Sequence, residues 1–77
     1  MPDDVPRLTL REWRETVAFL TLRELALKLG TTESAVSLWE RGLRRPRLPM
    51  QRRIAEVLGI QPGQIIWKPA EGKDLAA

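Results

Sequence analysis

The sequence contains no cysteine and no histidine. Without cysteine there is no disulfide framework and no thiolate metal site, and without histidine the commonest general base is missing. Only carboxylates remain as metal ligands. No nucleophile–base pair and no glycine-rich phosphate loop is recognisable either, so we expect neither an enzyme nor a cofactor.

Long apolar runs are missing as well. No segment approaches the roughly 18 apolar residues of a membrane span, and the N-terminal segment MPDDVPR is acidic and polar, unlike a signal peptide. We therefore expect a cytoplasmic protein with no membrane partner. At 77 residues the chain forms one domain, near the lower size limit for independent folding.

The apolar positions follow a helical period, and no segment shows the alternation of a strand. The capping-box tetrapeptide Thr-Leu-Arg-Glu occurs twice, at Thr9 and at Thr21, and each copy predicts the start of a helix. The predicted organisation is a flexible arm (1–8), a compact all-α five-helix bundle (9–67) and a flexible tail (68–77). The expected helices cover residues 9–18, 21–29, 33–41 and 49–58, and a short fifth turn or helix follows residue 61.

The segment TLRELALKLGTTESAVSLWERG (21–42) is the most informative part of the chain. Two short helices that cross at a steep angle need a small residue at the crossing and a glycine at the break, and Ala26 and Gly30 meet these needs. Val36 and Trp39 anchor the second of these helices to the core. Its other face remains polar, which is the arrangement that places a helix in a DNA major groove; this face carries Glu33, Ser34 and Ser37.

Positive charge is concentrated directly after this pair of helices. The net charge is only +3, but six of the 13 cationic residues lie between Arg41 and Arg53, and this stretch contains no carboxylate. A cluster without internal counter-ions indicates a polyanionic partner, although an isolated basic run is more often a solvated face. Because this cluster directly follows the two helices, we favour the interpretation that it binds a polyanionic partner.

The run LALKLGTTESAVSLWERG, followed by RRPR and IAEVLGI, resembles the phage-repressor (Cro/repressor-like, XRE-type) helix-turn-helix domains. The resemblance covers roughly residues 21–66 and implies a lambda-repressor-like fold. In that family the start and the solvent face of the third helix contact bases. The ends of the second and third helices and the loop that follows hold phosphates.

The sequence departs from the family pattern in two places. Leu22 stands where relatives usually have a glutamine that grips a phosphate, so this interaction is either absent or supplied by Arg23. The first helix reaches its connection with about one residue more than usual. Glu15 therefore falls where many relatives place an arginine, with Arg14 beside it.

The candidate base contacts each have a second interpretation. Glu33 can accept a hydrogen bond from a cytosine amino group, or simply stabilise the positive N-terminus of its helix. Ser34 and Ser37 can contact a base or a phosphate, or neither, and Leu38 packs against a thymine methyl group or covers the edge of the motif. The candidate phosphate contacts are helix caps and arginines, whose forked guanidinium groups fit phosphate oxygens: Thr21, Arg23, Thr31, Thr32, Arg41, Arg44, Arg45 and Arg47.

These features together predict a sequence-specific double-stranded DNA-binding transcriptional regulator, most simply a repressor. A homodimer, formed in solution or only on DNA, would place two recognition helices in successive major grooves. Its expected interface is an exposed apolar patch of Ile65, Ile66 and Trp67, and no small-molecule ligand is evident. The alternative is a helix-turn-helix scaffold that acts as a protein-interaction module of the antitoxin or adaptor kind. It is favoured by the apolar Leu22 and Leu38 together with the patch formed by residues 65–67.

Overall fold

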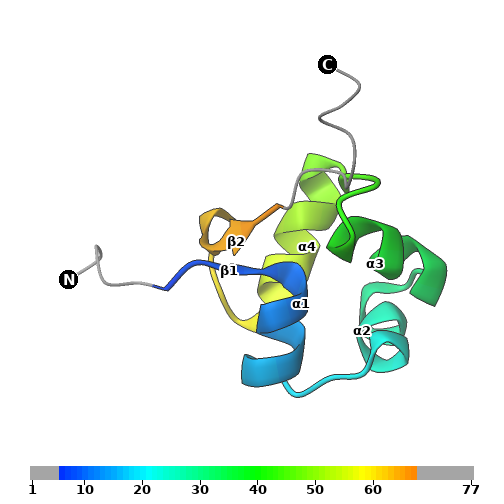
Figure 1. The fold of residues 1–77 in the computed structure, drawn as a ribbon, viewed down its shortest axis with the longest axis horizontal. Coiled ribbons are helices and arrows are strands. Elements are labelled where there is room, and N and C mark those ends of the chain that lie inside the picture. Colours follow the sequence, from blue (N-terminus) through cyan, green and yellow to red (C-terminus); the bar gives the residue numbers. More distant parts are fainter. Residues whose placement is uncertain (1–5, 68–77) are drawn as a thin grey trace.

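The computed structural model describes residues 6–67 (Figure 1). Residues 1–5 of the expected arm and the expected tail 68–77 lie outside the described residues. Within the described part, none of the helices combines the length and hydropathy that a membrane span requires. The elements are, in order, β1 (Leu8–Thr9), α1 (Leu10–Glu12), the π-helical turn η2 (Trp13–Val17), α2 (Leu22–Leu29), α3 (Glu33–Glu40), α4 (Leu48–Leu58), the 3₁₀ turn η3 (Pro62–Gln64) and β2 (Ile65–Ile66).

The first helix begins at the predicted capping box and ends in a π-helical turn. The Thr9 hydroxyl accepts a hydrogen bond from the Glu12 amide (3.2 Å), and the Glu12 side chain accepts one from the Thr9 amide (2.9 Å). Further along, the Ala18 amide donates to the Trp13 carbonyl (2.9 Å), five residues earlier. A π turn accommodates one extra residue within a helix. This turn therefore absorbs the additional residue that the sequence indicates here.

The connection from η2 to α2 contains a residue in the left-handed conformation. Phe19 has a φ of 54°, which is rare for a residue with a bulky side chain, and the residue is 78% exposed. Its ring therefore gains little from burial in the monomer. A strained backbone that carries an exposed aromatic ring is a feature that folding alone does not explain.

The two ends of the described chain meet in a small parallel sheet. Leu8 pairs with Ile65 and Thr9 with Ile66, and the indole nitrogen of Trp13 donates to the Gln64 carbonyl (2.9 Å). The expectation of no strand is therefore wrong. Leu8, which was expected in the arm, is half-buried in β1 and belongs to the domain.

The expectation of a fifth helix is also wrong, although the all-α class with a helix-turn-helix is confirmed. Within residues 6–67 the structure has four α-helices, and the region after residue 61 forms only η3 and then β2. Gln61 and Gln64 close a single 3₁₀ turn, with the Gln64 amide donating to the Gln61 carbonyl (2.9 Å). The β-branched Ile65 and Ile66 then favour extended backbone, which continues as the strand.

One hydrophobic core joins all the helices. Leu25, Val36 and Ile54 are fully buried and come from α2, α3 and α4. Arg53 on α4 adds a polar link, because its Nε donates to the Leu29 carbonyl (3.2 Å) at the end of α2. This bond satisfies one of the free carbonyls of the helix terminus. The relative placement of α2, α3 and α4 is thus set by both apolar packing and a helix cap.

Candidate nucleic-acid interface

The unit formed by α2 and α3 has a capping signal at each helix start and a glycine between the helices. Thr21 and Glu24 make the predicted capping box of α2, with bonds of 3.0 and 2.8 Å. Gly30, with a φ of 74°, ends α2 in the left-handed conformation, and the Thr31 amide donates to the Ala26 carbonyl (3.0 Å). Glycine adopts this left-handed conformation at little energetic cost, and the helix therefore ends sharply at this position. After two intervening residues, α3 begins at Glu33.

The N-cap of α3 is Thr32. The Thr32 hydroxyl accepts a hydrogen bond from the Ala35 amide (3.1 Å), so Thr32 is the N-cap and Thr31 is half-buried in the turn. Thr21 and Thr32 are both exposed, although their hydroxyls are engaged in capping. Each hydroxyl oxygen therefore lies at a positively polarised helix N-terminus, where an anion is stabilised.

The two faces of α3 have different surroundings. Val36 and Trp39 are buried in the core, as the sequence indicates. The opposite side is open: Glu33 and Ser34 are exposed, and Ser37 and Leu38 are half-buried. This second group is defined here as the outer face of α3 (Glu33, Ser34, Ser37, Leu38 and Arg41). Positions separated by three, four and seven residues share one side of a helix, which accounts for the grouping.

A buried ion pair fixes α3 against the first helix. Arg14 in η2 and Glu40 at the end of α3 are only 8% and 7% exposed in their side chains. The Arg14 Nε donates to Glu40 Oε2 (2.6 Å), its second nitrogen to Oε1 (3.1 Å), and its third to the Leu20 carbonyl (2.9 Å). The hydrogen bond to Glu40 raises the pKa of Arg14 above its ordinary value, against the lowering effect of burial. Sequence analysis missed this pair, since periodicity places Arg14 beside Trp13 without a partner.

A polar hollow of about 590 Å³ lies between the first helix and α3. On its lining, Arg11 donates to Glu15 across one helical turn (3.0 Å), and Arg14 lies 3.5 Å from the same carboxylate. The lining also includes Ser37 and Arg41 from the outer face. Three arginines and three glutamates balance each other in this lining. Among the described residues, no three carboxylates come together in a way that could hold a metal ion.

The loop from Arg41 to Arg47 is ordered by hydrogen bonds to its backbone, which leaves its guanidinium groups free. The amides of Leu43 and Arg44 both donate to the Leu38 carbonyl (3.0 and 3.3 Å), and the Gln51 side chain donates to the Pro46 carbonyl (2.8 Å). Pro46 itself is buried. The exposed side chains of this loop are Leu43 and the four predicted phosphate ligands, Arg41, Arg44, Arg45 and Arg47.

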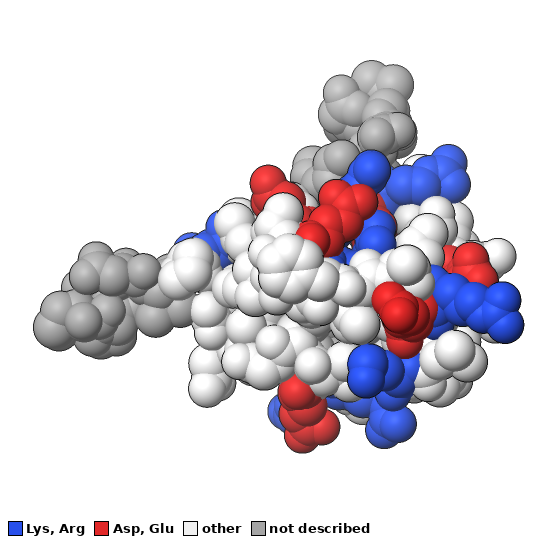
Figure 2. All heavy atoms as spheres, turned by 90° about the horizontal axis from the view of Figure 1, so that it is seen from below, with Lys and Arg blue, Asp and Glu red and all other residues white. Residues whose placement is uncertain are grey.

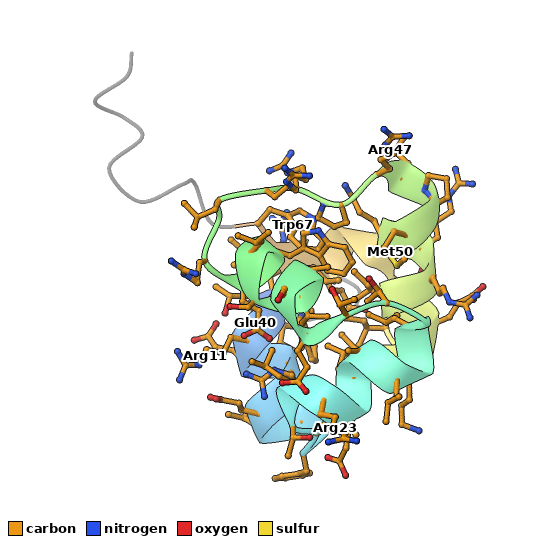
Figure 3. The ribbon with its side chains drawn as sticks, turned by 90° about the vertical axis from the view of Figure 1, so that its right-hand side faces the viewer. Arg11, Arg23, Glu40, Arg47, Met50 and Trp67 are labelled. Atoms are coloured by element: carbon orange, nitrogen blue, oxygen red, sulfur yellow. The ribbon has the colours of Figure 1, made fainter. Side chains whose placement is uncertain are left out.

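The arginines border α3 on two sides. Arg41 lines hollows on the outer face, whereas Arg44, Arg45 and Arg47 surround a groove of about 430 Å³ that has Ala35, Trp39, Pro46 and Met50 in its lining. In Figure 3, Arg47 and Arg23 lie on opposite sides of α3. Arg23 is exposed in the first turn of α2. The structure thus brings the predicted base and phosphate residues to one region of the surface.

The three residues expected to form an apolar patch do not share one environment. Ile65 is 5% exposed and lies in the core, so the expectation that it is exposed is wrong. Trp67 is half-buried and packs against the core, and Ile66 is 44% exposed. The backbone of Ile65 belongs to the β1–β2 pair, and its side chain lies in the core. Ile66 and part of Trp67 remain at the surface.

One known protein family matches most of the chain. A family model described as "Helix-turn-helix" covers residues 10–65. The match includes the first helix, α2, α3 and α4, and it ends at β2. No curated protein and no solved structure matches the chain significantly.

Proposed function

Because this chain belongs to the XRE-type helix-turn-helix family of DNA-binding transcription regulators, we propose that it is a sequence-specific repressor that binds double-stranded DNA. In this proposal α3 enters the major groove, and Glu33, Ser34, Ser37 and Leu38 contact base edges. The observation that carries the proposal is the outer face of α3. It is open to solvent while Val36 and Trp39 hold the opposite side in the core.

The charged groups around α3 support this orientation. A helix in the major groove has a phosphate backbone on each side, and cationic groups border α3 on two sides. The proposed phosphate ligands are the cap residues and arginines at the ends of α2 and α3 and in the loop that follows. They are Thr21, Arg23, Thr31, Thr32, Arg41, Arg44, Arg45 and Arg47. Arginine contacts supply much of the affinity by releasing counter-ions, and the outer face of α3 supplies discrimination.

A pair of these domains would suit a palindromic operator. Two recognition helices related by a two-fold axis reach successive major grooves about 34 Å apart. We propose that Ile66 and the exposed part of Trp67 contribute to the contact between copies. Two apolar groups form a small surface, which favours pairing that is completed on DNA.

Selection from random duplexes tests this function. We expect the full chain to enrich one sequence family, and its binding to weaken steeply with salt. If a dimer makes on the order of six phosphate contacts, log K falls against log salt with a slope near −5. Fluorescence anisotropy on an enriched duplex at several salt concentrations measures the slope. Failure to enrich any sequence, together with a flat salt response, contradicts the proposal.

A protein-interaction role is the second candidate, and one observation favours it. Phe19 and Leu27 are 78% and 70% exposed, and neither belongs to the outer face of α3. The connection that carries Phe19 lies at the bottom of Figure 1, on the face that Figure 2 shows with a broad uncharged area. If this surface is the functional one, Phe19→Ser abolishes partner binding while DNA binding never appears in the wild-type chain.

A further inference from the structure

We propose that the hollow between Leu22 and Leu38 is a site for the C5-methyl group of a pyrimidine that lies beside an exocyclic amino group of cytosine. This inference rests on the proposed function and adds the chemical group that is read. The hollow has a volume of about 360 Å³ and joins the start of α2 to the outer face of α3. Its lining consists of Leu22, Glu33, Ser34, Ser37, Leu38 and Arg41.

The two leucines supply apolar walls where the remaining lining is polar. Leu22 follows the N-cap of α2 and is half-buried, and Leu38 is half-buried in the second turn of α3. They come from different helices, yet both line the same hollow. In the major groove, the apolar group that a base edge presents is the C5 methyl of thymine or of a methylated cytosine. A methyl placed between two leucines removes apolar surface from water on both sides.

Glu33 narrows the choice of base. It is exposed in the first turn of α3 and lines this hollow with the leucines. A carboxylate accepts a hydrogen bond from the N4 amino group of cytosine, and it is repelled by the O4 acceptor of thymine. A single 5-methylcytosine presents the methyl and the amino group on one edge. A thymine next to a cytosine presents the same two groups on neighbouring base pairs.

This reading gives Leu22 a different role from that of a phosphate ligand. A leucine side chain has no donor for a phosphate, and Leu22 packs against the core as well as lining the hollow. Arg41 lies on the same lining and is exposed. Phosphate binding at this edge therefore falls to Arg41 and to the neighbouring Arg23, while Leu22 contributes to specificity.

The test begins with the tightest duplex from the selection described above. Each thymine is replaced in turn by uracil, which removes only the methyl group, and each cytosine by 5-methylcytosine, which adds one. We expect one position per half-site at which the methyl strengthens binding about fourfold, as expected for one buried methyl group. A methyl effect at a cytosine identifies 5-methylcytosine as the base that supplies both the methyl and the amino group. An effect at a thymine that adjoins a cytosine identifies the adjacent pair.

Variants then assign the effect to the hollow. Leu22→Gln and Leu38→Ala are each expected to reduce the methyl effect to less than twofold, whereas Leu27→Ala, an exposed change elsewhere on α2, leaves it intact. Glu33→Gln should remove the preference for the amino-bearing base and retain the methyl effect. Circular dichroism verifies that each variant is folded.

Two results would overturn the inference while leaving the proposed function intact. One is a selected duplex in which no methyl substitution changes the affinity by twofold. The other is a methyl effect that persists unchanged in both folded leucine variants. If no duplex is enriched at all, the proposed function is refuted and this inference with it.

Discussion

Replacing Arg14 by methionine is expected to lower the free energy of unfolding by about 3–5 kcal/mol, because it leaves the Glu40 carboxylate buried without its partner. The Leu20 carbonyl loses a donor in the same variant. A domain of this size has a total stability of roughly 4–12 kcal/mol. The variant is therefore expected to be partly unfolded at 37 °C.

Urea unfolding followed by tryptophan fluorescence measures this loss, since Trp13 and Trp39 are both buried. Arg11→Met is the matched control: the side chains of Arg11 and its partner Glu15 are 67% and 44% exposed, so the loss is below about 1 kcal/mol. The double variant Arg14→Met with Glu40→Leu removes both charges and should recover most of the stability. Equal losses for Arg14→Met and Arg11→Met would show that the buried pair does not hold α3 in place.

The second large effect concerns DNA affinity. Replacing Arg44 and Arg45 together by alanine is expected to weaken binding to every duplex about 100-fold for each bound protomer, at roughly tenfold for each guanidinium group removed from a phosphate. Because these side chains would contact phosphates, the enriched sequence stays the same. The salt slope becomes less negative by roughly 2 for each protomer.

Anisotropy titrations at several salt concentrations measure both quantities. The control is Lys28→Ala with Arg52→Ala, which removes the same charge from exposed positions outside the proposed contacts. We expect this control to weaken binding less than threefold through the change in net charge alone. Similar losses for the two double variants would mean that the loop makes no specific contact with DNA.

The helix-turn-helix could be predicted from the sequence because its determinants are local. The capping box at Thr21, the glycine at position 30 and the Thr32 cap each act within one helical turn, and the structure has all three. The buried positions Val36 and Trp39 follow from helical periodicity. The family resemblance over the same residues then implies that the outer face of α3 is the one that contacts DNA.

Two of the features that escaped prediction depend on contacts distant in sequence. Arg14 and Glu40 are 26 positions apart, and neither shows by its local pattern that it will be buried. The strand pair between Leu8 and Ile65 is only two residues long on each side, too short for an alternating pattern to be seen. The π turn has no sequence signature of its own. Its trace in the sequence is the additional residue in the first helix, which the resemblance to the family indicates.

NMR on the ¹⁵N-labelled chain, with an enriched duplex added stepwise, maps the surface that contacts DNA. The outer face of α3 is expected to lie against the duplex. We predict that the largest amide shift changes occur between Thr31 and Arg47 and at the start of α2. Amides around Phe19 and in the second half of α4 should remain unchanged. Shift changes centred on Phe19 and Leu27, with α3 unaffected, would contradict the account.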